Sequence, residues 1–141
     1  MPELQRPAPR RLDLLTIFVD DLPTMVRFYR DTLGLETPWN GDEPYAEFRH
    51  SGIRFALFPR RNLEQMMGVD ATYPIGLNGS FSLSIQFDDP NQVDAEYERL
   101  HILGVPDVYA PRDEPWGLRS AMVQDPEGNL LELAAWLPEA G

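Results

Sequence analysis

The sequence predicts an α+β fold in which two βαβββ modules form one cupped, mixed sheet. Three features predict it: apolar residues that alternate as in strands, two amphipathic helical segments, and a repeat of this order of elements along the chain. The 141 residues, 43% of them hydrophobic, suit a single domain with a substantial core.

The first half of the chain begins with an apolar segment at 12–19, which is expected to form a strand. An Asp-Asp pair follows, and then a helical pattern with Pro23 in its first turn and Gly34 at its end. Proline is tolerated in the first turn of a helix, and glycine commonly ends one. This part of the sequence therefore predicts a strand, an acidic turn and a helix.

The second half repeats this order as FSLSIQF, Asp-Asp-Pro, a helical pattern and Leu-Gly-Val. The spacing between Asp20 and Asp88, about 68 residues, predicts an internal duplication. Turn signals such as NGDEP and HSG divide the remaining apolar runs into short strands. These strands are expected at 35–39, 43–49 and 52–58 in the first half, and near 106–110, 115–124 and 129–136 in the second.

The domain organisation follows from this pattern. Residues 1–11, which are rich in proline and arginine, are expected to form a flexible arm. The single domain is expected to span 12–136, with a first module at 12–58, a connector at 59–79 and a second module at 80–136.

The strand that begins at Ser80 carries two different faces. Alternation with a period of two places large apolar residues on one side, where a helix is expected to cover them. The opposite side carries small neutral polar groups, which suit the wall of a cavity better than a face in open water. The apolar face is Phe81, Leu83, Ile85 and Phe87, and the polar face is Ser80, Ser82, Ser84 and Gln86.

Charge excludes several classes of function. Asp and Glu number 23 against 12 basic residues, all of them arginine, so the net charge is −11. Such a chain repels phosphates, and a nucleic-acid partner is not expected.

The absence of lysine excludes Schiff-base chemistry, and the absence of cysteine excludes thiolate chemistry and disulfides. A cytoplasmic location is expected, because no secretory signal and no membrane-spanning apolar run is present.

Two motifs, VDDL…FYRDTLGL and VQDPEGNLLEL, resemble the vicinal oxygen chelate superfamily. This superfamily includes glyoxalase I, ring-cleaving dioxygenases and bleomycin resistance proteins. The resemblance covers about residues 12–136 and implies the glyoxalase/bleomycin resistance fold, usually assembled as a homodimer. Within the second motif, DPEGN is expected to be a structural turn, since proline and glycine suit turn positions.

The resemblance also implies where a metal would bind. Metal-dependent members use four side chains, and these positions fall on Leu14, Ala56, Ser82 and Glu132 here. Only Glu132 is a competent ligand, so a metal-free site is expected and a divalent metal is the less favoured alternative. Glu132 is therefore the candidate catalytic residue, with the role of a general base. The alternative is a structural role, as a buried carboxylate paired with an arginine.

Arg54 and Arg119 are the expected partners of Glu132. Trp116, in the segment PWGLR, resembles a feature of the bleomycin resistance branch, whose metal-free members sequester a cationic antibiotic in an acidic dimer crevice. Trp39 and Tyr45 flank the NGDEP loop and are expected at the opposite rim of the cup. The predicted ligand-binding residues are Phe18, Trp39, Arg54, Phe58, Ser82, Ser84, Gln86, Trp116, Arg119 and Glu132.

These residues predict a small-molecule binding protein that holds an aromatic or cationic ligand in the cup. The alternative is a metal-dependent lyase or dioxygenase of the glyoxalase type, with a divergent site around Glu132. A third option is a dimeric module whose cup has lost its function. No membrane partner is expected in any of these cases.

Overall fold

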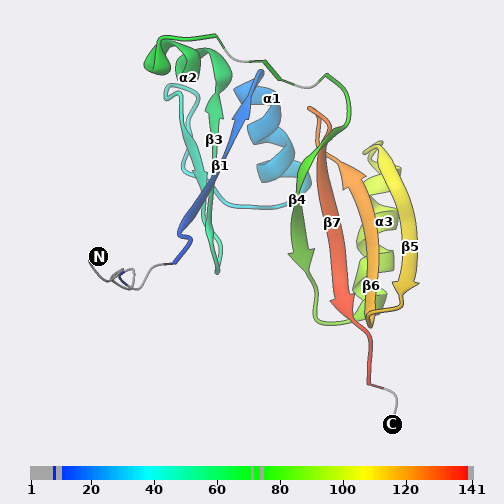
Figure 1. Ribbon diagram of the computed structural model, residues 1–141. Coiled ribbons are helices and arrows are strands. Elements are labelled where there is room, and N and C mark those ends of the chain that lie inside the picture. The colour runs from blue at the N-terminus through cyan, green and yellow to red at the C-terminus, as the bar shows by residue number, and fades with distance from the viewer. Residues whose placement is uncertain (1–7, 9–10, 71, 74, 140–141) are drawn as a thin grey trace.

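The computed structural model of the protein describes residue 8 and residues 11–70, 72–73 and 75–139 (Figure 1). It contains a three-stranded sheet of order β1-β3-β2 and a four-stranded sheet of order β4-β7-β6-β5, which confirms the predicted α+β class. The predicted arm, 1–11, lies outside the described residues except at positions 8 and 11. The elements are β1 (Leu14–Val19), α1 (Leu22–Arg27), the π-helical turn η1 (Phe28–Thr32), β2 (Ala46–Phe48), β3 (Arg54–Pro59), α2 (Arg60–Met67), β4 (Asn78–Gln86), α3 (Pro90–Ile102), β5 (Asp107–Glu114), β6 (Leu118–Gln124) and β7 (Asn129–Trp136).

The first module is held together by its helical segment. Asp21 caps α1 by accepting a hydrogen bond from the backbone N–H of Thr24 at 3.1 Å. The helical turn η1 continues α1 and buries Tyr29 against the sheet, where its ring centroid lies 5.0 Å from that of Phe55. β1 pairs in parallel with β3, and β2 pairs with β3 in the antiparallel direction.

The prediction of a strand at 35–39 is wrong. Only one isolated bridge, between Glu36 and Arg49, joins this stretch to the end of β2. Pro38 has no N–H to donate to a ladder. The side chain of Thr37 donates to the carbonyl oxygen of Glu47 at 2.8 Å instead, so a side chain replaces part of the backbone pairing. The stretch therefore follows the edge of β2 without forming a strand.

The second module matches its predicted order more closely. β4 pairs in parallel with β7, and β6 joins β7 to β5 through antiparallel pairs. α3 begins with a capping box. The side chain of Asp89 accepts a hydrogen bond from the backbone N–H of Gln92, and the side chain of Gln92 accepts one from the backbone N–H of Asp89. The alternation along β4 is confirmed: Ser82, Ser84 and Gln86 are exposed, whereas the apolar residues between them pack against the core.

The segment DPEGN forms the predicted turn and also joins the two modules. The N–H of Gly128 donates to the carbonyl oxygen of Asp125 at 3.0 Å, which closes the turn between β6 and β7. The buried carboxylate of Asp125 accepts a hydrogen bond from the hydroxyl of Tyr29 at 2.7 Å. Burial first, and then the charge of Asp125, raise the pKa of Tyr29 well above its usual range, so the hydroxyl keeps its proton and the bond persists.

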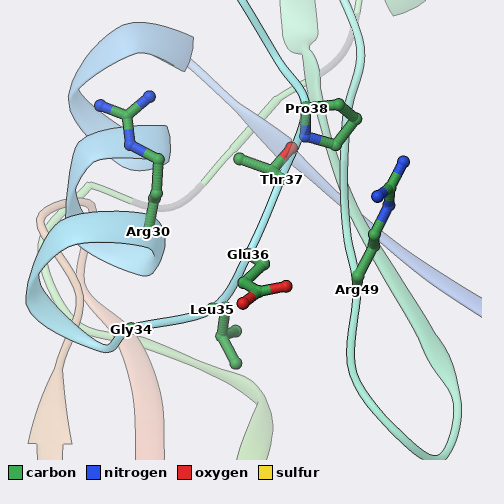
Figure 2. Close-up of a pocket in the computed structure, with 7 residues that line it drawn as sticks. All are labelled: Arg30, Gly34, Leu35, Glu36, Thr37, Pro38 and Arg49. Carbon is green, nitrogen blue, oxygen red and sulfur yellow. The ribbon is translucent and has the colours of Figure 1, made fainter.

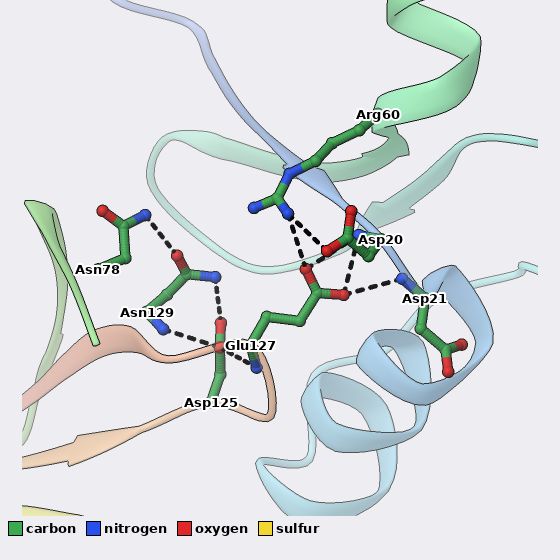
Figure 3. A network of polar contacts seen from close by, with 7 residues as sticks. All are labelled: Asp20, Asp21, Arg60, Asn78, Asp125, Glu127 and Asn129. Carbon is green, nitrogen blue, oxygen red and sulfur yellow. Dashed lines mark hydrogen bonds and ion pairs between the residues drawn. The ribbon is translucent and has the colours of Figure 1, made fainter. Parts of the chain in front are cut away.

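Glu127 makes a second connection between the modules (Figure 3). Its carboxylate accepts hydrogen bonds from the backbone N–H groups of Asp20 at 2.9 Å and Asp21 at 2.8 Å, at the junction of β1 and α1. Arg60, the first residue of α2, donates to the carboxylate of Asp20 at 2.7 Å. In Figure 1, α1 lies between β1 and the β4 edge of the second sheet.

None of the helices in the described part of the chain is long and apolar enough to span a membrane.

Candidate functional site

The first sheet places three of the predicted ligand-binding residues on one face. Phe18 and Phe58 are cross-strand neighbours whose rings meet edge to face, with centroids 6.3 Å apart. Arg54 lies on the same face and donates to Glu47 at 2.7 Å and to Asp13 at 2.8 Å. The hydrogen bond from Arg54 is also the main cause of a lowered pKa for Glu47. The guanidinium of Arg54 is thus bound within its own module.

The second sheet places Glu132 beside Ser84. The two residues are cross-strand neighbours, and the hydroxyl of Ser84 donates to Oε1 of Glu132 at 2.8 Å. The prediction that Glu132 pairs with Arg54 or Arg119 is therefore wrong. Its carboxylate is half-buried and is held by a neutral hydroxyl group, on the face that also carries Met122.

Arg119 of β6 and Glu132 of β7 lie on opposite faces of the second sheet. Arg119 is paired with Ala135 and Glu132 with Met122, and positions an odd number of residues apart point to opposite sides of a strand. The guanidinium of Arg119 binds Asp94 of α3 at 2.9 Å and Asp113 at 2.8 Å. This arginine joins β6 to the helix, away from the polar face of β4.

Three further predicted residues, Ser82, Gln86 and Trp116, are exposed. Ser82 and Gln86 lie on the open polar face of β4, and the amide of Gln86 makes a long hydrogen bond of 3.4 Å to the carbonyl oxygen of Phe87. Trp116 occupies the tip of the hairpin between β5 and β6 and is 64% exposed. Gly117 closes that tip by donating to the carbonyl oxygen of Glu114 at 3.0 Å.

A polar cluster on β5 and β6 was not predicted from the sequence. The guanidinium of Arg112 lies 3.8 Å from the centroid of the Tyr109 ring and binds Glu114 at 2.6 Å. The hydroxyl groups of Tyr109 and Ser120 are 3.1 Å apart. Register shifts along β5 bring these residues together, and such bulges leave no periodic signal in the sequence.

The four positions that correspond to metal ligands in the family do not form a suitable donor set. Leu14 and Ala56 have no donor atom, and Ala56 is fully buried. Ser82 and Glu132 together offer one hydroxyl and one carboxylate, whereas a structural or catalytic cation takes several oxygen or nitrogen donors. Within the described ranges, no three His, Cys, Asp or Glu side chains gather as they would around a metal ion.

A recess of about 290 Å³ follows the edge of β2 in the first module. Trp39 and Tyr45 supply its aromatic surfaces, and Glu43 and Glu47 supply its negative charge. The indole N–H of Trp39 donates to the carbonyl oxygen of Glu43 at 2.8 Å, and the hydroxyl of Tyr45 donates to Glu47 at 2.6 Å. Burial and then the bond to Glu47 raise the pKa of Tyr45, so this hydroxyl remains a donor.

Of the predicted ligand-binding residues, Trp39 lines this recess. Tyr45, which was expected with Trp39 at the rim of the cup, lines the recess as well. The two glutamates were missed. Glu43 lies in the NGDEP turn segment, where an acidic residue usually indicates only a solvated loop, and Glu47 is a single charged residue within β2. A second recess, of about 420 Å³, adjoins the first and shares Thr37 and Pro38 with it (Figure 2).

Comparison with known proteins identifies the family. Residues 11–133 match the model of the Glyoxalase/Bleomycin resistance protein/Dioxygenase superfamily. The uncharacterized protein YraH of Bacillus subtilis (strain 168) is 31% identical over 122 residues, which cover 84% of this chain and 93% of that protein.

Two solved structures of similar proteins support the same assignment. A glyoxalase/bleomycin resistance protein/dioxygenase from Nocardioides is 27% identical with a TM-score of 0.76, and the match covers 99% of this chain and 93% of that one. A lactoylglutathione lyase from Agrobacterium tumefaciens is 27% identical with a TM-score of 0.69, with 90% and 94% covered. The chain therefore belongs to the Glyoxalase/Bleomycin resistance protein/Dioxygenase superfamily.

Proposed function

We propose that the protein is a small-molecule binding protein that holds an aromatic or cationic ligand without a metal. The observation that carries this proposal is the recess in which Trp39 and Tyr45 lie beside Glu43 and Glu47. An aromatic face attracts a cation by about 0.5–2 kcal/mol, and nearby carboxylates add to this attraction. A recess of this size suits one planar cationic group rather than a large ligand.

Local charge decides which ligand is favoured. At physiological ionic strength the screening length is about 8 Å, so most of the net charge of −11 acts weakly on a ligand in the recess. The carboxylate of Glu47 already binds Arg54 and Tyr45. Within residues 11–70, 72–73 and 75–139, Glu43 takes part in no ion pair, so its carboxylate is the group that favours a cation.

Benzamidine is expected to bind this recess more tightly than benzamide or benzoate, which share its ring but lack its positive charge. NMR titration measures this through the indole N–H signal of Trp39, while the signals of Trp116 and Trp136 serve as internal references. Glu43→Gln is expected to weaken benzamidine binding about fivefold, the effect of about 1 kcal/mol. The matched control is Glu98→Gln on α3, an exposed glutamate far along the chain from the recess, which is expected to change nothing.

Two further results would decide against the proposal. Equal binding of the three probes would remove the role of charge, and a shift that persists unchanged in Glu43→Gln would place the ligand elsewhere. Binding is expected to be the same with and without EDTA. Benzamidine binding that requires an added divalent cation would instead favour the metal-dependent lyase or dioxygenase with Glu132 at its centre.

We also propose that the protein forms a homodimer. β1 and β4 are edge strands of separate sheets, and an unpaired strand edge is a template for pairing with another chain. Phe81, Leu83 and Ile85 of β4 remain only partly covered. Light scattering coupled to size-exclusion chromatography is expected to give twice the mass of the chain. A monomer mass at all concentrations would contradict this proposal.

A further inference from the structure

The larger recess, of about 420 Å³, lies where the helical segment of the first module ends. Arg30 of η1 lies on one side of it, and Arg49, the residue after β2, lies on the other. The extended stretch from Gly34 to Pro38 forms the wall between them. Figure 2 shows the side chain of Glu36 between the two arginines.

The charged side chains around this recess differ in whether they already bind an opposite charge. Arg30 uses Nε and Nη2 to bind the carboxylate of Asp31, at 2.8 and 3.0 Å. The backbone N–H of Arg49 donates to the carbonyl oxygen of Glu36 at 2.7 Å, which holds these two residues next to each other. Across residues 11–70, 72–73 and 75–139, however, neither Arg49 nor Glu36 takes part in an ion pair.

This combination of charges favours a particular class of ligand. A guanidinium group presents paired N–H donors that match the two oxygens of a carboxylate. Glu36 repels a simple anion in the same recess but attracts an ammonium group. Because charges beyond about 8 Å are screened at physiological salt, the acidic remainder of the chain opposes such a ligand only weakly.

We propose that this recess binds a small amino carboxylate. Its carboxylate is bound by Arg49, with Arg30 as the second cation, and its ammonium group is bound by Glu36. The proposal does not depend on the aromatic recess, since the two recesses share only Thr37 and Pro38. It adds a second ligand class to that of the proposed function.

The test compares three probes of the same chain length: γ-aminobutyrate, butyrate and butylamine. NMR titration follows the backbone amide of Gly34 and the side-chain Nε–H signals of Arg30 and Arg49. The intact protein is expected to bind γ-aminobutyrate about tenfold more tightly than either singly charged probe, because each of these makes only one of the two ionic contacts.

Two variants separate the roles of the charges. Arg49→Gln is expected to weaken the binding of γ-aminobutyrate about tenfold. Glu36→Gln is expected to abolish the preference for γ-aminobutyrate and to strengthen the binding of butyrate. Both residues are exposed, so both variants are expected to fold, and a thermal unfolding curve checks this. The matched control is Arg61→Gln on α2, which removes an exposed arginine away from the recess and is expected to have no effect.

The proposal is overturned by any of three results. The signal of Gly34 does not respond to γ-aminobutyrate, or all three probes bind equally, or Arg49→Gln binds as the intact protein does. Weaker benzamidine binding in Glu43→Gln tests the aromatic recess alone, so failure of one proposal is distinguishable from failure of the other.

Discussion

Gly128→Ala is expected to destabilise the protein by about 3 kcal/mol and to lower its melting temperature by on the order of 10 °C. A Cβ at this position would lie 2.0 Å from the backbone oxygen of Gly76 and 3.3 Å from Cα of Leu77. These are backbone atoms of the chain that leads into β4, so no side-chain rotation relieves the contact. Thermal and urea unfolding followed by circular dichroism measure the loss.

Gly104→Ala separates the steric contact from the backbone conformation. Gly104 has φ of +82° and Gly128 has φ of +83°, so both positions penalise a side chain to the same degree. A Cβ at Gly104 meets no atom within 4 Å. Its replacement is expected to cost only about 1 kcal/mol. Equal losses in the two variants would show that the contact with Gly76 adds nothing to the cost of the substitution.

Asp125→Ala is expected to be at least as severe, with a loss of about 3–5 kcal/mol in the free energy of unfolding. Asp125 is 2% exposed, and its carboxylate accepts four hydrogen bonds. The donors are the hydroxyl of Tyr29 at 2.7 Å, the backbone N–H groups of Glu127 at 2.9 Å and Asn129 at 3.0 Å, and the side-chain amide of Asn129 at 2.8 Å. Truncation leaves these buried donors without a partner, and urea unfolding measures the cost.

Tyr29→Phe provides the comparison, because it removes one of the four donors and keeps the aromatic ring. Its expected cost is about 1 kcal/mol, the net value of one hydrogen bond. If Asp125→Ala proved no more damaging than Tyr29→Phe, the turn between β6 and β7 would not depend on the carboxylate. The connection between the modules would then rest on Glu127 and on apolar packing.

Much of the fold was predictable because its signals are local. The alternation along β4 separates Ser84 from Leu83 whatever lies nearby, since successive side chains of a strand point to opposite faces. The cap of α3 at Asp89 is likewise a matter of a few neighbouring residues. The repeat of these signals in the two halves predicted two modules, and the family resemblance predicted their arrangement.

The failures concern contacts that depend on the register and packing of separate elements. The stretch 35–39 has strand-like residues, but the contact of Thr37 with Glu47 and the missing N–H of Pro38 reduce it to one bridge. Arg119 was expected to pair with Glu132 because both residues lie in the second module. The register between β6 and β7 places it on the other face, against α3.

Local residue patterns predict the two modules, the faces of β4 and the lack of a metal donor at Leu14 and Ala56. The hydrogen bond from Ser84 to Glu132, and the gathering of charged side chains along the edge of β2, become visible only once the chain is folded. Strand periodicity and residue chemistry are properties of neighbouring residues, so a short segment is enough to reveal them. Register, bulges and the approach of one loop to another depend on free energy shared across the whole fold.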